Sequence, residues 1–203
     1  MHMQTSFLTE AHSYLKLLQE GFTDEALETV QQLASDLLEV WTSGNQVLIC
    51  GNGGSAANAL HIANDFHYGI GACGNGPFIP GLKVEALPSN PAIITCLAND
   101  TGFENIFKLQ LQVKGQKNDV LIALTGSGNS ENIVRAIKYS RELGMRNYVI
   151  TAFDGGRCKK IADNAIHIPI NDMQIAEDSQ LLIAHICMQW LNKNKPSTIK
   201  PLK

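Results

Sequence analysis

Two short segments rich in glycine, serine and asparagine contain the residue types that bind phosphate. They are residues 50–55 (CGNGGS) and 125–130 (TGSGNS), and each follows a short apolar run and precedes a helical pattern. Glycine lets the backbone approach a ligand closely, and the amides at the start of a helix point toward an anion. Serine and threonine hydroxyls add donors. One such turn is common in α/β proteins for steric reasons alone, but two in one small chain predict a phosphorylated small-molecule ligand.

A histidine and an aspartate after the first turn have the spacing of a cation site. His61 and Asp65 are four residues apart in a segment expected to be helical from Ser55 to Phe66, so both side chains lie on one face. Ser55 is the expected N-cap of that helix. Alone, this spacing is more typical of an ordinary exposed hydrogen-bonded pair. Beside the glycine-rich turns, it favours an imidazole and a carboxylate that face the ligand.

Glu177 and His185 are a second candidate pair, eight residues apart in a helix expected from about Ile175 to Asn192. On one straight helix they would be about 12 Å apart along its axis, too far to bind the same small ion. Either Glu177 precedes the regular helix, or the two residues serve different sites across a subunit boundary. Taken alone, His185 among apolar neighbours is more typical of a packed histidine, and Glu177 of an acid at a helix start.

Short apolar strands alternate with helices along the chain and position these residues. The expected strands are residues 47–50, 84–87, 120–124, 147–152 and 165–170, and the segment from Gly69 to Lys83 is expected to be a loop. This alternation predicts a parallel sheet with helices on both faces. Ligands of such sheets bind beyond the carboxyl ends of the strands, where both glycine-rich turns belong.

Two helices are expected before the first strand, and a small sheet leaves them no face to cover. That surplus indicates an oligomer. We therefore divide the chain into N-terminal oligomerisation helices at residues 1–43, a domain at 44–193 that binds the phosphorylated ligand and a polar tail at 194–203.

Composition narrows the class of protein. The 203 residues are 44% hydrophobic and 17% charged, with a net charge of −3, which is typical of a globular domain. The chain has no basic stripe for nucleic acid, no apolar run long enough for a membrane and no secretory segment, so we expect a cytoplasmic protein. Its five scattered cysteines form no CxxC pair, which argues against a disulfide framework and against a thiolate zinc site.

Taken together, five motifs resemble the SIS (sugar isomerase) domain family, and within it the phosphoheptose isomerases. They are residues 51–55 (GNGGS), 98–100 (AND), 127–130 (SGNS), 154–156 (DGG) and the late helix with His185. Those enzymes convert sedoheptulose 7-phosphate into D-glycero-D-manno-heptose 7-phosphate for lipopolysaccharide or capsule synthesis. The resemblance implies a three-layer sandwich with a five-stranded parallel sheet, a homotetramer with active sites at subunit interfaces, and a bound zinc ion.

The resemblance also implies roles for individual residues. Asp65 corresponds to the catalytic base, and His185 to a catalytic acid/base. The implied metal ligands are His61, Asp65, Glu177 and His185. The implied substrate-binding residues are Asn52, Gly53, Gly54, Ser55, Asn99, Asp100, Thr125, Gly126, Ser127, Ser130 and Glu177.

Some positions depart from the family pattern. Asp65 replaces a glutamate and reaches about an ångström less far, enough to affect rate. Glu177 falls where glutamine is common, and Gly69 where arginine is common. Two other functions stay open: a non-catalytic SIS regulator, such as one that associates with the replication initiator, and a sugar-phosphate sensor. The histidines at 61 and 185 and the acid at 65 favour an aldose–ketose isomerase.

Overall fold

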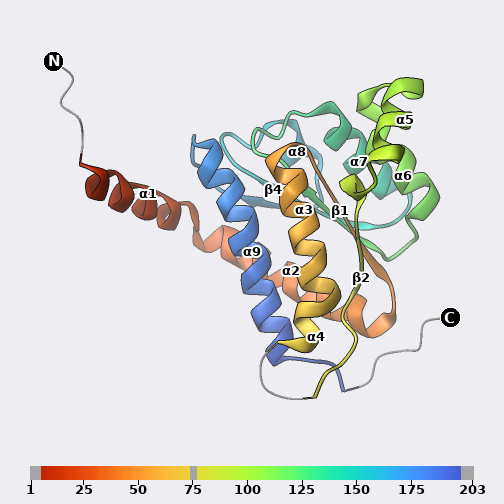
Figure 1. The fold of residues 1–203 in the computed structure, drawn as a ribbon, viewed down its shortest axis with the longest axis horizontal. Coiled ribbons are helices and arrows are strands. Elements are labelled where there is room, and N and C mark those ends of the chain that lie inside the picture. Colours follow the sequence, from red (N-terminus) through yellow and green to blue (C-terminus); the bar gives the residue numbers. More distant parts are fainter. Residues whose placement is uncertain (1–5, 74–76, 198–203) are drawn as a thin grey trace.

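A five-stranded parallel β-sheet forms the centre of the molecule in the computed structural model, which describes residues 6–73 and 77–197 (Figure 1). The strand order is β2-β1-β3-β4-β5, and every neighbouring pair is parallel. The strands are β1 (Gln46–Gly51), β2 (Lys83–Ala86), β3 (Val120–Leu124), β4 (Arg146–Thr151) and β5 (Asn164–His167). The predicted three-layer α/β sandwich with five parallel strands is therefore confirmed.

Helices cover both faces of the sheet, because successive strand residues point to opposite sides. In β1, Val47 and Ile49 belong to one buried core, and Leu48 and Cys50 to the other. The helices of the first core are α1 (Phe7–Gly21), α2 (Asp24–Ser43), α3 (Gly54–Asn64), α4 (Ile70–Ala72) and α9 (Met173–Lys193). Those of the second are α5 (Pro91–Thr101), α6 (Ile106–Lys114), α7 (Glu131–Glu142) and α8 (Gly156–Ile161).

The helix after the first glycine-rich turn differs from its prediction at both ends. Its N-cap is Gly53, with a φ of 55°, and not Ser55. At its other end the chain continues through a π-helical turn, η1 (Asp65–Gly69), into α4, so the predicted loop begins too early. The reason is burial: Phe66 and Ile70 are almost fully buried and extend the apolar stripe of the helix.

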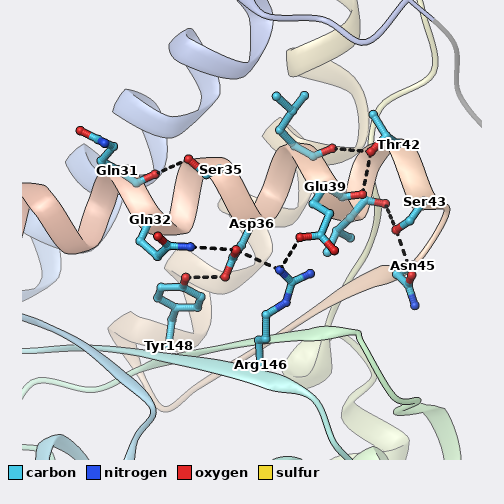
Figure 2. A network of polar contacts seen from close by, with 12 residues as sticks. Gln31, Gln32, Ser35, Asp36, Glu39, Thr42, Ser43, Asn45, Arg146 and Tyr148 are labelled. Carbon is cyan, nitrogen blue, oxygen red and sulfur yellow. Dashed lines mark hydrogen bonds and ion pairs between the residues drawn. The ribbon is translucent and has the colours of Figure 1, made fainter.

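A buried polar network attaches α2 to β4 (Figure 2). Asp36 of α2 is only 7% exposed and accepts hydrogen bonds from the Tyr148 hydroxyl at 2.6 Å and from Arg146 Nη1 at 2.9 Å. The same Arg146 nitrogen donates to Glu39 at 2.8 Å, and Gln32 Nε2 donates to Asp36 at 3.0 Å. The expectation that neither N-terminal helix finds a place on the sheet is therefore wrong for α2.

Helix α1 differs from α2 because it extends away from the body of the molecule (Figure 1). Phe7, Leu8 and Leu15 of α1 are exposed, while the hydroxyl of Tyr14 donates to Asp178 of α9 at 2.6 Å. Among the described residues, no helix combines the length and the apolar character that crossing a membrane requires. The predicted domain boundaries stay predictions, and the end of the predicted tail, from residue 198, lies outside the described residues.

Candidate active site and metal centre

Three side chains from two helical segments meet at one point. Helices α3 and α9 lie side by side (Figure 1). Nε2 of His61 and Nε2 of His185 are 3.1 Å apart, and Oδ2 of Asp65 lies 3.4 Å from the first and 3.2 Å from the second. Asp65, the first residue of η1, has a side chain that is 14% exposed, while the two imidazoles are more open to solvent. The structure thus brings together three of the four predicted metal ligands and both predicted catalytic residues.

The chemistry and the spacing of this cluster suit a divalent cation. Two imidazole nitrogens and a carboxylate oxygen all offer lone pairs, and they lie within 4.8 Å of one another. Donors about 2.0 Å from a tetrahedral zinc ion are about 3.3 Å from one another. The observed separations of 3.1, 3.2 and 3.4 Å match that edge. Three protein ligands would leave one position for water or substrate, as in catalytic zinc sites.

Glu177 does not belong to this cluster in a single chain. It lies inside α9, which is continuous from Met173 to Lys193, so Glu177 does not precede the regular helix. Its carboxylate faces the first turn of α3 instead, where a Cβ atom added to Gly54 would collide with it. Eight residues of one helix separate Glu177 from His185, which is why the two cannot share an ion within one chain.

Some of the predicted substrate-binding residues in the first glycine-rich turn are exposed, and others are buried. Gly53 and Gly54 are exposed at the start of α3, and a Cβ added to Gly53 would meet nothing within 4 Å. Ser55 is only 5% exposed, and its hydroxyl accepts a hydrogen bond from Gln180 Nε2 at 3.0 Å. Ser55 therefore contacts α9. Gly53 is open to a ligand, whereas Gly54 lies beside the Glu177 carboxylate.

The second turn is divided in the same way. Thr125 is buried, and its Oγ1 accepts from the amide of Gly128 at 3.3 Å. Gly126 is also buried, whereas Ser127 is exposed and Ser130 is half-buried at the N-cap of α7. The hydroxyls of Ser127 and Ser130 are thus the ones that a ligand can reach.

A pair of asparagines joins the first turn to the start of α7, the helix that follows the second turn. Asn52 and Asn132 exchange hydrogen bonds between their side-chain amides, at 2.9 and 2.8 Å, although they are eighty residues apart. The two turns follow β1 and β3, which are adjacent in the sheet. The prediction that both turns lie at one edge of the sheet is therefore confirmed.

Asn99 and Asp100 lie apart from the histidine–aspartate cluster. They are exposed at the end of α5, at one margin of the molecule (Figure 1). Their side-chain hydrogen bonds are local: Asn99 donates to Asp100 at 2.7 Å, and the Cys96 thiol contacts Asp100 at 3.6 Å. Within the described residues, no hydrogen bond or ion pair connects either of them to the cluster.

Two hollows flank the sheet. A small one of about 240 Å³ adjoins the first turn, between Gly51, Asn52 and Gly53 and apolar side chains of α5 and α6. A larger one of about 740 Å³ lies beside the amino ends of β1 and β2, against Trp41 and Tyr68. Only the small hollow lies at the carboxyl edge of the sheet, where ligands of parallel sheets bind.

A family model for the SIS domain matches residues 12–152. The chain belongs to the SIS domain family. A phosphoheptose isomerase of Aneurinibacillus thermoaerophilus is 36% identical over 166 residues, which cover 80% of each chain. A phosphoheptose isomerase of Fusobacterium nucleatum is 30% identical over 199 residues, which cover 95% of each.

Solved structures agree with this assignment. The structure of a phosphoheptose isomerase from Neisseria gonorrhoeae is similar with a TM-score of 0.82 and 26% identity, covering 92% of this chain and 96% of that one. One from Francisella tularensis has a TM-score of 0.81 and 26% identity, covering 93% of this chain and all of that one. Because these structures cover more than nine-tenths of this chain, the similarity extends beyond residue 152, where the match to the family model ends.

Sequence reasoning missed two amide side chains of this SIS domain. Asn132 and Gln180 are each 1% exposed, and both connect segments that are far apart along the chain. The helical spacing of the sequence could have found Gln180, because it lies four residues after Ala176 and three before Ile183, on the buried face of α9. A polar residue in a buried helical register needs a partner, but the sequence does not say which one.

Proposed function

We propose that the protein is an aldose–ketose isomerase that converts sedoheptulose 7-phosphate into D-glycero-D-manno-heptose 7-phosphate. The observation that carries the proposal is the convergence of His61, Asp65 and His185 within 3.1–3.4 Å, at the C-terminal end of α3. The names of the relatives from Aneurinibacillus thermoaerophilus and Fusobacterium nucleatum support the substrate. Placement in lipopolysaccharide or capsule synthesis follows from the family resemblance, and placement in the cytoplasm follows from the composition of the sequence.

The reaction needs two proton movements. A base removes a proton from C1 of the ketose and returns it to C2, through an enediolate, while another proton moves from O1 to O2. We assign the carbon proton to Asp65 and the oxygen proton to His185. A zinc ion held by His61, Asp65 and His185 would stabilise negative charge on the sugar oxygens.

The phosphate would bind at the turns. The amides of the exposed Gly53 and Gly54 and the hydroxyls of Ser127 and Ser130 offer donors near the N-termini of α3 and α7. This assignment uses fewer residues than the sequence predicted, because the side chains of Ser55 and Thr125 bond within the protein.

A homotetramer would complete the site. Asn99, Asp100 and Glu177 lie away from the cluster of their own chain, so we assign them to sites formed with other copies. Exposed apolar side chains around the cluster support such contacts. They are Leu60, Leu182, Ile186 and Trp190.

The decisive experiment is incubation with a panel of ketose phosphates in D₂O, followed by NMR of the products. We expect an aldose heptose phosphate, with deuterium at C2 wherever the proton held by the base exchanges with solvent before its return, and loss of turnover of at least a hundredfold in His185→Ala with phosphosugar binding retained. His12→Ala, which removes an exposed histidine of α1, is the matched control. Binding of a ketose phosphate by wild type without any turnover would instead support the regulator or sensor.

Metal removal tests the zinc separately. We expect one zinc per chain in the purified protein, loss of turnover after dialysis against a chelator, and recovery on adding zinc. Full activity in metal-free protein would remove zinc from the proposal and leave the isomerase intact.

A further inference from the structure

One buried amide connects the two helices that carry the histidine–aspartate cluster. The Gln180 side chain of α9 is 1% exposed, and its Nε2 donates to Ser55 Oγ of α3 at 3.0 Å. Its Oε1 accepts from Asn58 Nδ2, also at 3.0 Å, and that nitrogen donates as well to the backbone oxygen of Glu177. Both polar atoms of the Gln180 amide therefore have hydrogen-bond partners, Ser55 and Asn58, in the first two turns of α3.

These bonds set the register of α9 against α3. Asn58 is one turn before His61, and Gln180 is five residues before His185. Each segment is continuous helix over that span, so a shift of Asn58 or Gln180 along the helix axis also shifts the histidine that follows it. A slip of one residue moves a helix by about 1.5 Å along its axis. Such a slip would break the 3.1 Å approach of the two imidazoles.

We propose that Gln180 is a positioning residue for the metal centre, which holds His185 opposite His61 and Asp65 without contacting the metal or the substrate itself. The proposal rests on the proposed metal-dependent isomerase. It also gives Ser55 a different role from the predicted one, since its hydroxyl receives the Gln180 amide and does not face the ligand. Replacing a group that hydrogen-bonds directly to a metal ligand typically changes metal affinity by about 10–100-fold, and Gln180 acts one step further out, through the register of α9 against α3.

The test measures zinc affinity in Gln180→Met, which keeps the length of the side chain and removes both hydrogen bonds. We expect the zinc dissociation constant, measured by competition with a chromophoric chelator, to rise by up to about tenfold, the lower end of the effect of a direct partner. The visible absorption of the cobalt-substituted protein should also change, because it reports the arrangement of the ligands. Gln174→Met, an exposed glutamine on the same helix, is the matched control and should leave both unchanged.

Ser55→Ala removes the same hydrogen bond from the other helix and guards against a Gln180 variant that folds poorly. We expect a similar loss of zinc affinity, and little further loss in the double variant, because the two side chains act as one unit. A lower melting temperature with unchanged zinc affinity and cobalt spectrum would show a merely structural Gln180 and overturn the inference. Wild-type protein that binds no zinc would contradict both the proposed metal centre and the role of Gln180. If that protein still turned over the ketose phosphate, the proposed isomerase activity would be retained.

Discussion

The Asp65 carboxylate contacts both imidazoles of the cluster through a single oxygen, at 3.4 and 3.2 Å. The sequence comparison raised the concern that aspartate is too short at this position. In the structure Asp65 begins a π-helical turn, although its own backbone dihedrals, φ −65° and ψ −41°, remain those of an α-helix. Single π-helical turns within helices are frequent at functional sites. The shorter side chain still reaches both histidines of its own chain, and its shorter reach toward the substrate stays a prediction.

The five cysteines divide into two groups by exposure. Cys73 and Cys96 are exposed, and Cys50, Cys158 and Cys187 are buried. Burial disfavours the thiolate and raises the pKa of Cys158 to about 11 and that of Cys187 to about 12. At pH 8 a thiol with a pKa near 11 is only about 0.1% ionised, and the thiolate is the reactive form.

We expect iodoacetamide at pH 8 to alkylate Cys73 in the native protein and to leave Cys50, Cys158 and Cys187 unmodified. Raising the pH increases the thiolate fraction, but burial still blocks access of the reagent. Peptide mass spectrometry measures the labelling, and the urea-unfolded protein should be labelled at all five cysteines. Native labelling of Cys158 at the rate of Cys73 would contradict this account.

At the scale of elements, side-chain networks fix how the helices sit on the sheet. Asp36 connects α2 to β4 through Tyr148 and Arg146 (Figure 2), and Asn52 connects the first turn to α7. Desolvation raises the pKa of the Tyr148 hydroxyl, and its hydrogen bond to Asp36 raises it further. Tyr148 therefore stays protonated and keeps donating to Asp36 throughout the physiological pH range.

Asp36→Ala should reduce the free energy of unfolding by about 2–4 kcal/mol, because it leaves the buried Tyr148 hydroxyl without an acceptor and removes an ion pair from Arg146. Urea unfolding followed by circular dichroism measures the loss. Glu39→Gln is the control, since Glu39 pairs with the same arginine but its side chain is 65% exposed. Its expected cost is about 0–1 kcal/mol. Equal effects of the two substitutions would refute a special role for the buried carboxylate.

At the scale of the whole molecule, apolar side chains remain uncovered in places that a single chain does not explain. Helix α1 projects from the body, and α5 has no buried residue at all. Around the cluster, Ile186 and Trp190 are 46% and 38% exposed. Contiguous apolar surface of this kind is typical of an interface. It agrees with the proposed homotetramer.

Light scattering of the wild type should therefore give four times the chain mass of 22.1 kDa. Trp190→Glu should reduce that mass, because a carboxylate buried in an apolar contact is left unpaired. Val113→Glu is the control, since Val113 is 84% exposed on α6, across the sheet from α9. A monomeric wild type would contradict the proposal that residues of other copies complete the active site.

The amino-acid sequence by itself determined the parallel sheet, the position of both glycine-rich turns at one edge, and the pairing of His61 with Asp65. These features depend on local patterns, namely apolar strands, helix starts and a four-residue spacing. Only the tertiary structure decided that His185 joins that pair, that Glu177 does not, and that Ser55 bonds to Gln180. The physical reason is that these contacts depend on how α9 packs against α3. Helix packing is set by the fit of many side chains across more than a hundred residues of chain, and no local pattern records it.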